Sequence, residues 1–171
     1  MMSEARGFPP VASQHARVLI LGSMPGRESL ERRQYYAHPR NAFWPIMRRL
    51  FGICEGPYGT MTQALANHGV AVWDVLQACF RPGSLDSNID AGSMVTNDFP
   101  SFFAEHPRIK RVFFNGAKAE SIYVKQVLPH LDSVTACLPL ARLPSTSPAH
   151  AGMNLAQKTE AWRVILDKCL E

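Results

Sequence analysis

The stretch from Val18 to Met47 constrains the fold more than any other part of the chain. It opens with the continuous apolar run Val18–Leu21, which breaks at the turn Gly22-Ser23-Met24-Pro25-Gly26. A short apolar run without polar alternation is typical of a strand buried on both faces of a parallel sheet. Open α/β sheets bind their ligands at the carboxyl ends of such strands. We therefore expect a binding site at this turn.

Strand-like and helix-like segments alternate along the rest of the chain. Strands are predicted at 17–21, at 70–75, at 111–114 and within 133–143, where Pro139 interrupts the run. Helices are predicted at 42–51, 60–68, 97–104, 117–127 and 154–170. This alternation predicts a three-layer α/β/α fold around a central, mostly parallel sheet of about four strands. We expect residues 17–171 to form one domain and residues 1–16 to be a loosely held N-terminal arm.

The composition fits a globular domain that can meet an anionic partner. Hydrophobic residues make up 46% of the 171 residues, enough to bury a core, and charged residues make up only 19%. The net charge of +4 permits an anionic partner without requiring one. Six arginines fall between residues 27 and 49, and their planar side chains suit phosphate. A solvated basic helix face would give the same pattern.

Several site classes and locations are disfavoured by the sequence. The four cysteines are widely spaced and form no C-x-x-C pair, which argues against a zinc knuckle or an iron–sulfur cluster, so we expect no metal and no cofactor. Residues 1–16 lack the apolar core of a signal peptide, and no apolar run reaches membrane-spanning length. We expect a cytoplasmic monomer that works at the nucleoid and has no membrane partner.

The glycines of the first turn do not form a known nucleotide motif. Arg27-Glu28 follows Gly26, where a Walker A loop needs lysine and then serine or threonine. The G-x-G-x-x-G pattern of dinucleotide-binding folds is also absent from this turn. A nucleoside triphosphate or NAD site is therefore not predicted here.

Three motifs together resemble the uracil-DNA glycosylase superfamily. They are the turn at residues 22–26, the run YYAHPRNAFW at residues 35–44 and the late loop LPSTSP at residues 143–148. The resemblance spans about residues 18–170 and is greatest to the hypoxanthine (deoxyinosine) DNA glycosylase branch. Mismatch-specific uracil glycosylases share the A-H-P-x-N-x-F-W pattern. The resemblance implies a base-flipping enzyme that removes hypoxanthine from double-stranded or single-stranded DNA and leaves an abasic site.

By this resemblance, the first turn holds the flipped base through Gly22, Ser23 and Met24 and orients the attacking water. Many uracil-specific members place Asn or Asp directly before the proline of this turn, where this chain has Met24. A thioether neither accepts a useful hydrogen bond nor polarises water. This departure puts uracil excision in doubt and is typical of the deoxyinosine branch. Asn41 is the best candidate to replace the missing group, although it also suits a helix cap.

Two further residues are predicted to bind the base. Tyr36 corresponds to the aromatic on which the extruded base stacks, an interaction worth about 1–3 kcal/mol per base; it could instead be a half-buried loop tyrosine. Asp74 corresponds to the position where uracil-specific members read the base edge with Asn. A carboxylate there can accept from the N1–H of hypoxanthine, or it can cap a loop. The polar cluster at residues 84–88 either lines the same mouth or is an ordinary loop.

The remaining candidates are expected to contact DNA or the leaving base. Ser145 and Ser147 of the late loop offer hydroxyls to flanking phosphates. Arg40 is predicted to bind DNA, and Asn115 either touches a phosphate or occupies a turn. His150 is predicted to be catalytic, with a DNA contact or a wedge as the alternative.

No lysine is placed to form a Schiff base, so the enzyme is predicted to be monofunctional. Three alternatives stay open: a mismatch-type uracil or broad deaminated-base glycosylase, a catalytically inactive DNA-binding module of the same fold, and a nucleoside hydrolase. The basic loop and the missing acidic calcium cluster disfavour the nucleoside hydrolase.

Overall fold

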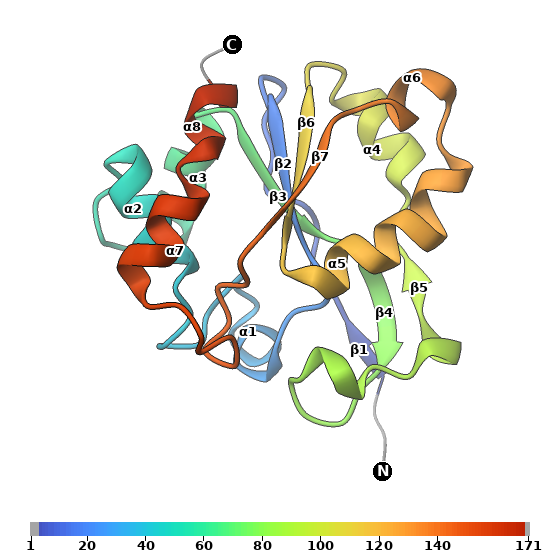
Figure 1. The fold of residues 1–171 in the computed structure, drawn as a ribbon, viewed down its shortest axis with the longest axis horizontal. Helices are drawn as coiled ribbons and strands as arrows, with labels where there is room; N and C mark the ends of the chain where they lie inside the picture. Colours follow the sequence, from blue (N-terminus) through green and yellow to red (C-terminus); the bar gives the residue numbers. More distant parts are fainter. Residues whose placement is uncertain (1–3, 170–171) are drawn as a thin grey trace.

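A four-stranded parallel sheet forms the centre of the computed structural model, which describes residues 4–169 (Figure 1). Its strands are β2 (Val18–Gly22), β3 (Val70–Asp74), β6 (Arg111–Asn115) and β7 (Leu140–Leu143), in the order β3-β2-β6-β7. All residues of β2 and β3 are buried, as their continuous apolar runs predict. The predicted three-layer fold with about four mostly parallel strands is confirmed. Residues 1–3 and 170–171, which the predictions also covered, lie outside the described residues.

Helices cover both faces of this sheet (Figure 1). One layer contains α2 (Phe43–Phe51), α3 (Tyr58–Asn67), α7 (Leu155–Trp162) and α8 (Val164–Cys169). The other contains α4 (Phe99–Glu105), α5 (Ala117–Ile122) and α6 (Ser133–Ala136). A short α1 (Arg27–Arg32) follows the first turn. Among the described residues, no helix has both the length and the hydropathy needed to cross a membrane.

A second, antiparallel sheet lies at one end of the molecule and was not predicted. It consists of β1 (Glu4–Arg6), β4 (Leu76–Phe80) and β5 (Val95–Thr96), in the order β1-β4-β5. Only Val75 separates β4 from β3, and its N–H donates to the carbonyl of Gly22 at 2.8 Å. The chain therefore bends out of the first sheet directly into the second, in a stretch where no strand was predicted.

The N-terminal segment is not a loosely held arm, so that prediction is wrong for residues 4–16. β1 pairs antiparallel with β4, and Val11 exchanges two main-chain hydrogen bonds with Val72 at 2.9 and 2.8 Å. The carbonyl of Phe8 accepts from the indole N–H of Trp73 at 3.1 Å. The segment is ordered because it supplies an edge strand and satisfies buried polar groups of the core.

The chain on either side of Pro139 also differs from the prediction. Residues 133–136 form α6, with Asp132 as its cap, and the last strand is only β7. The carbonyl of Pro139 accepts from Val112 at 3.0 Å, so pairing with β6 begins at this residue. Proline offers no N–H to a ladder, which places it at the start of the strand.

Candidate active site

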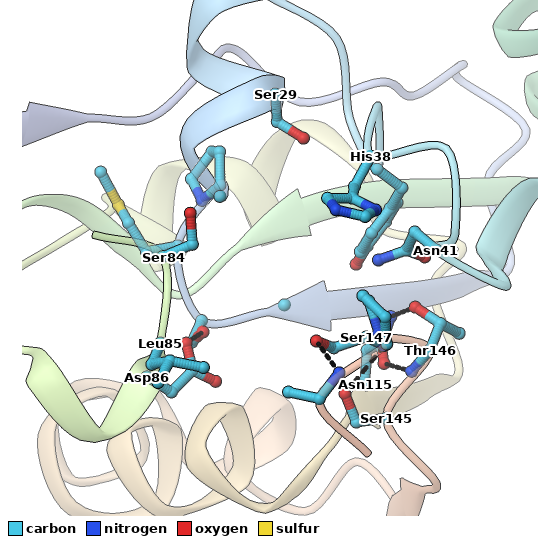
Figure 2. Close-up of a pocket in the computed structure, with 18 of the residues that line it drawn as sticks. Ser29, His38, Asn41, Ser84, Leu85, Asp86, Asn115, Ser145, Thr146 and Ser147 are labelled. Carbon is cyan, nitrogen blue, oxygen red and sulfur yellow. Dashed lines mark hydrogen bonds between the residues drawn. The ribbon is translucent and has the colours of Figure 1, made fainter. Parts of the chain in front are cut away.

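A cleft of about 740 Å³ opens at the carboxyl ends of β2, β3 and β6. Its walls are the first turn with α1, residues 35–41, the loop at 83–87 and the late loop at 145–150 (Figure 2). The structure brings all but one of the predicted site residues to this cleft: Gly22, Ser23, Met24, Tyr36, Asn41, Asp74, Asn115, Ser145, Ser147 and His150. The exception, Arg40, lines an adjoining smaller pocket.

Gly22 allows two polar side chains to meet at the floor of the cleft. It is the last residue of β2, and the parallel register places it opposite Asp74 of β3. A Cβ at Gly22 would lie 2.5 Å from Oδ1 of Asp74 and 3.0 Å from the hydroxyl of Tyr36. Real side chains do not tolerate the first distance, so any other residue would displace the carboxyl.

Asp74 carries a buried carboxyl that is not used as a loop cap. Its side chain is almost fully buried, with 3% exposure, and Oδ2 has no hydrogen-bond partner among the described residues. Burial first, and then the charge of Asp86, raise the pKa of this carboxyl to about 7, while Arg81 acts in the opposite direction. An unpaired buried polar atom is costly, so this oxygen marks a position that a ligand can complete.

Tyr36 packs its ring against Phe43 and brings its hydroxyl to the floor of the cleft. It adopts a left-handed backbone conformation at φ 56°, and its ring stacks on Phe43 with centroids 4.1 Å apart. Its hydroxyl is buried without a partner among the described residues. Burial, followed by the nearby Asp74, raises the pKa of this hydroxyl far above its ordinary value, so it remains a donor. Phe43 backs the ring while Tyr36 lines the cleft.

Asn41 lies just before the N-cap residue of α2, where its side chain binds the first N–H of the helix and also faces the cleft. Its Oδ1 accepts from the N–H of Phe43, the first residue of α2, at 2.9 Å. The amide nitrogen points into the cleft (Figure 2). The two predicted roles are therefore compatible, because the cap uses one lone pair of the oxygen and leaves both N–H groups to face a ligand.

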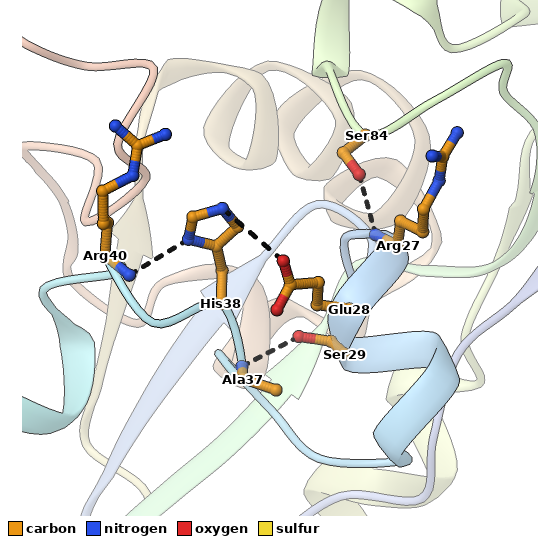
Figure 3. Close-up of polar contacts among 7 residues, drawn as sticks. All are labelled: Arg27, Glu28, Ser29, Ala37, His38, Arg40 and Ser84. Carbon is orange, nitrogen blue, oxygen red and sulfur yellow. Dashed lines mark hydrogen bonds and ion pairs between the residues drawn. The ribbon is translucent and has the colours of Figure 1, made fainter.

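The loop that follows β4 closes over the first turn. Ser23 donates to Oδ1 of Asp86 at 2.6 Å, and the buried Arg81 donates to the carbonyl of Pro25 at 2.6 Å. Ser84 accepts from the N–H of Arg27 at the start of α1 (Figure 3). The polar cluster of this loop thus lines the cleft. The sequence alone leaves this open for Asp86 and gives no signal for Arg81.

The late loop is held in place by residues buried beneath it. Thr146 is 1% exposed and exchanges two 2.9 Å hydrogen bonds with the side chain of Asn115, a pairing that the sequence does not signal (Figure 2). Its carbonyl accepts from Ala42 at 2.9 Å. The amide of Asn115 binds Thr146 with both its oxygen and its nitrogen, so Asn115 positions the loop and keeps one N–H and one oxygen lone pair for another partner. The signal available in the sequence was only its place at a strand end before Gly116.

Two histidines lie in the cleft wall in different environments. His150 is exposed at the boundary between the cleft and the smaller pocket. His38, which the sequence reading missed, accepts through Nδ1 from the N–H of Arg40 at 3.0 Å, and its Nε2 lies 3.8 Å from a carboxylate oxygen of Glu28 (Figure 3). An Nδ1 that accepts a main-chain N–H leaves the proton of the neutral ring on Nε2, facing Glu28.

The chemistry of the cleft is limited by what its lining contains. None of the described lining residues is a lysine. Within residues 4–167, whose side chains the structure describes, no group of three or more His, Cys, Asp or Glu side chains is arranged to hold a metal ion. The cleft offers acidic, amide, hydroxyl, imidazole and main-chain groups.

Comparisons with known proteins agree with this geometry. The family model described as the uracil DNA glycosylase superfamily matches residues 9–166. Two proteins named hypoxanthine DNA glycosylase, from Methanosarcina acetivorans and Methanosarcina barkeri, are 37% and 36% identical over 116 residues, which cover 67% of this chain and 72% of each relative. The solution NMR structure of a Methanosarcina acetivorans protein, described as a candidate uracil DNA glycosylase, matches with a TM-score of 0.80 and 29% identity over 99% of this chain and 100% of that one. The chain belongs to the uracil DNA glycosylase superfamily.

Proposed function

We propose that this protein is a monofunctional DNA glycosylase that flips deoxyinosine out of DNA and hydrolyses the bond between hypoxanthine and the sugar. Two relatives that match most of their own length carry the name hypoxanthine DNA glycosylase. The target carbon C1′ cannot be reached inside a duplex, so the nucleotide must leave the stack. A cleft of about 740 Å³ falls in the size range of small-molecule sites.

The observation that carries this proposal is the pair of unpartnered polar atoms at the cleft floor. Oδ2 of Asp74 and the hydroxyl of Tyr36 are both buried without partners among the described residues. Hypoxanthine offers an N1–H donor and an O6 acceptor on one edge. Above the pKa of about 7 of its carboxyl group, the Asp74 carboxylate can accept from N1–H while the Tyr36 hydroxyl donates to O6. Both orphaned groups would then be satisfied by one base.

The same arrangement discriminates against the normal base. Adenine presents a bare N1 acceptor and an amino donor, which is the reverse of the hypoxanthine pattern. Adenine would place its N1 lone pair against the Asp74 carboxylate, whereas the Tyr36 hydroxyl could accept from its amino group, so the discrimination comes from Asp74. Sites built to hydrogen-bond a base edge reject a mismatched edge strongly, because their buried polar groups stay unpaired.

The reaction breaks the C1′–N9 bond and adds water to C1′. Positive charge builds on the sugar and negative charge on the leaving purine, so preorganised donors aimed at the purine lower the barrier most. The Asn41 amide nitrogen points into the cleft and can serve as such a donor. Its Oδ1 keeps one lone pair to orient the water, since the other accepts from Phe43. Met24 provides no such acceptor.

The decisive experiment is incubation with a duplex that contains one deoxyinosine, followed by alkaline cleavage and gel analysis. We expect strand scission only after alkali, and faster scission for deoxyinosine than for matched uracil or xanthine duplexes. Salt-sensitive DNA binding without an abasic product would support the inactive-module alternative and overturn the proposal. Release of hypoxanthine from free inosine would instead indicate a nucleoside hydrolase.

Asn41→Ala tests the assigned chemistry within that assay. It should reduce single-turnover excision by at least tenfold while the affinity for DNA changes little, since a transition-state donor contributes mainly to the chemical step. Unchanged turnover would remove Asn41 from the mechanism.

A further inference from the structure

A second pocket of about 340 Å³ lies beside the cleft. The two share Asn41, Pro148 and His150 in their walls. The second pocket is lined on one side by the start of α2 and on the other by the start of α7. A DNA strand whose nucleotide occupies the cleft would therefore pass close to this pocket.

Lys158 is a buried cation in the wall of this pocket. It is 4% exposed, and its ammonium donates to the carbonyl of Ser147 at 3.3 Å. No carboxylate of residues 4–169 lies within 4.0 Å of it. An ammonium has three donors, and burial lowers the pKa of this one. Lys158 therefore occupies a position where an anion would offset the cost of burying the charge.

Two helix N-termini add to the positive character of the pocket. Ala42 and Pro45, at the start of α2, line it together with Leu155, the first residue of α7. Helix N-termini carry partial positive charge, which favours an anion and disfavours a cation such as Lys158. A lysine buried there is thus better explained by a bound anion than by the helix itself.

The remaining lining of the pocket carries no negative charge. Arg40 and His150 lie exposed at the rim, and none of the described lining residues is acidic. We propose that this pocket binds a backbone phosphate of the DNA strand that carries the flipped nucleotide, with Lys158 at its base and Arg40 at its rim. This inference rests on the proposed function only in requiring that the protein binds DNA.

A purely structural role for Lys158 would be to brace the late loop through Ser147. The two roles differ in one measurable respect. A lysine that only stabilises the loop affects the affinity for every DNA ligand equally. A phosphate contact, by contrast, is lost when that one phosphate is made neutral. The experiment therefore couples a protein variant to a change at a single phosphate.

The test measures binding of the full-length protein to a duplex with a stable abasic-site analogue. A series of duplexes carries one methylphosphonate each, moved along the damaged strand. We expect one position to weaken wild-type binding by about tenfold, the loss expected for one charged contact to phosphate. Lys158→Met should bind the unmodified duplex more weakly by a similar factor. A methylphosphonate at that position should not weaken the binding of this variant any further. For this variant, the slope of log affinity against log salt should fall by about 0.9.

Three variants make the outcome decisive. Lys158→Arg should keep the salt slope, and Lys125→Met, an exposed lysine after α5, should change neither slope nor affinity. Arg40→Gln is exposed and does not threaten folding, so it should couple to the same phosphate even if Lys158→Met fails to fold. The proposal would be overturned if, for both pocket variants, the loss of affinity caused by the substitution and the loss caused by the methylphosphonate simply multiplied at every phosphate position. If the pocket variants couple to one phosphate but the protein does not excise deoxyinosine, only the proposed function is refuted.

Discussion

Replacing Asp74 by Asn should abolish a specific pH dependence of folding stability. The pKa of the Asp74 carboxyl is about 7 in the folded protein, raised from 3.8 mainly by burial. The folded state therefore holds a proton between these values that the unfolded state has released. This extra bound proton stabilises the folded state relative to the unfolded state. The stabilisation is fully present below about pH 4 and is lost as the pH rises through 7.

The magnitude follows from the size of that shift. Each pKa unit corresponds to about 1.4 kcal/mol, and roughly two units of the shift fall between pH 5 and pH 7. Between pH 5 and pH 8 the wild type should lose about 2–3 kcal/mol through Asp74 alone. Asp74→Asn keeps the shape of the side chain and cannot titrate, so it should not show this loss.

Urea denaturation at pH 5 and pH 8 measures the effect directly. The difference between the two free energies of unfolding should be about 2–3 kcal/mol larger for the wild type than for Asp74→Asn. Asp167→Asn, which removes an exposed carboxylate on α8, is the control and should follow the wild type. If the wild type and Asp74→Asn show the same pH dependence, the carboxyl is not held protonated by burial and the reasoning fails.

Three further predictions follow from the cleft. Met24→Asn supplies an acceptor before the proline of the first turn and should raise uracil excision at least tenfold in the alkaline-cleavage assay; no gain would show that Met24 does not exclude uracil. Gly22→Ala places a methyl group 2.5 Å from Oδ1 of Asp74, so excision should fall by tenfold or more and the melting temperature should drop, whereas wild-type rates would contradict the packing argument. Asn115→Ala removes both bonds to Thr146 and should lower the free energy of unfolding by about 1–3 kcal/mol in urea titrations, an effect that a surface phosphate contact would not produce.

The central sheet could be read from the sequence because its signal is local. The buried run Val18–Leu21 and the strand ending at Asp74 are apolar over their whole length, and burial on both faces leaves that pattern. The second sheet left no comparable signal. β4 begins one residue after β3, and β1 is three residues long. Their pairing depends on contacts between distant parts of the chain, which no local pattern records.

The candidate site also has features that the sequence predicts and features that it does not. Many of the residue types around the cleft can be predicted from the sequence, because three motifs carry them at recognisable spacings. How each residue is used becomes clear only in the folded protein. Asn41 turns its oxygen to α2 and its nitrogen to the cleft, Asn115 binds Thr146, and Lys158 of the last helical region reaches a loop eleven residues away. The physical reason is that a side chain's role depends on which partners satisfy its donors and acceptors, and those partners are brought together only by folding.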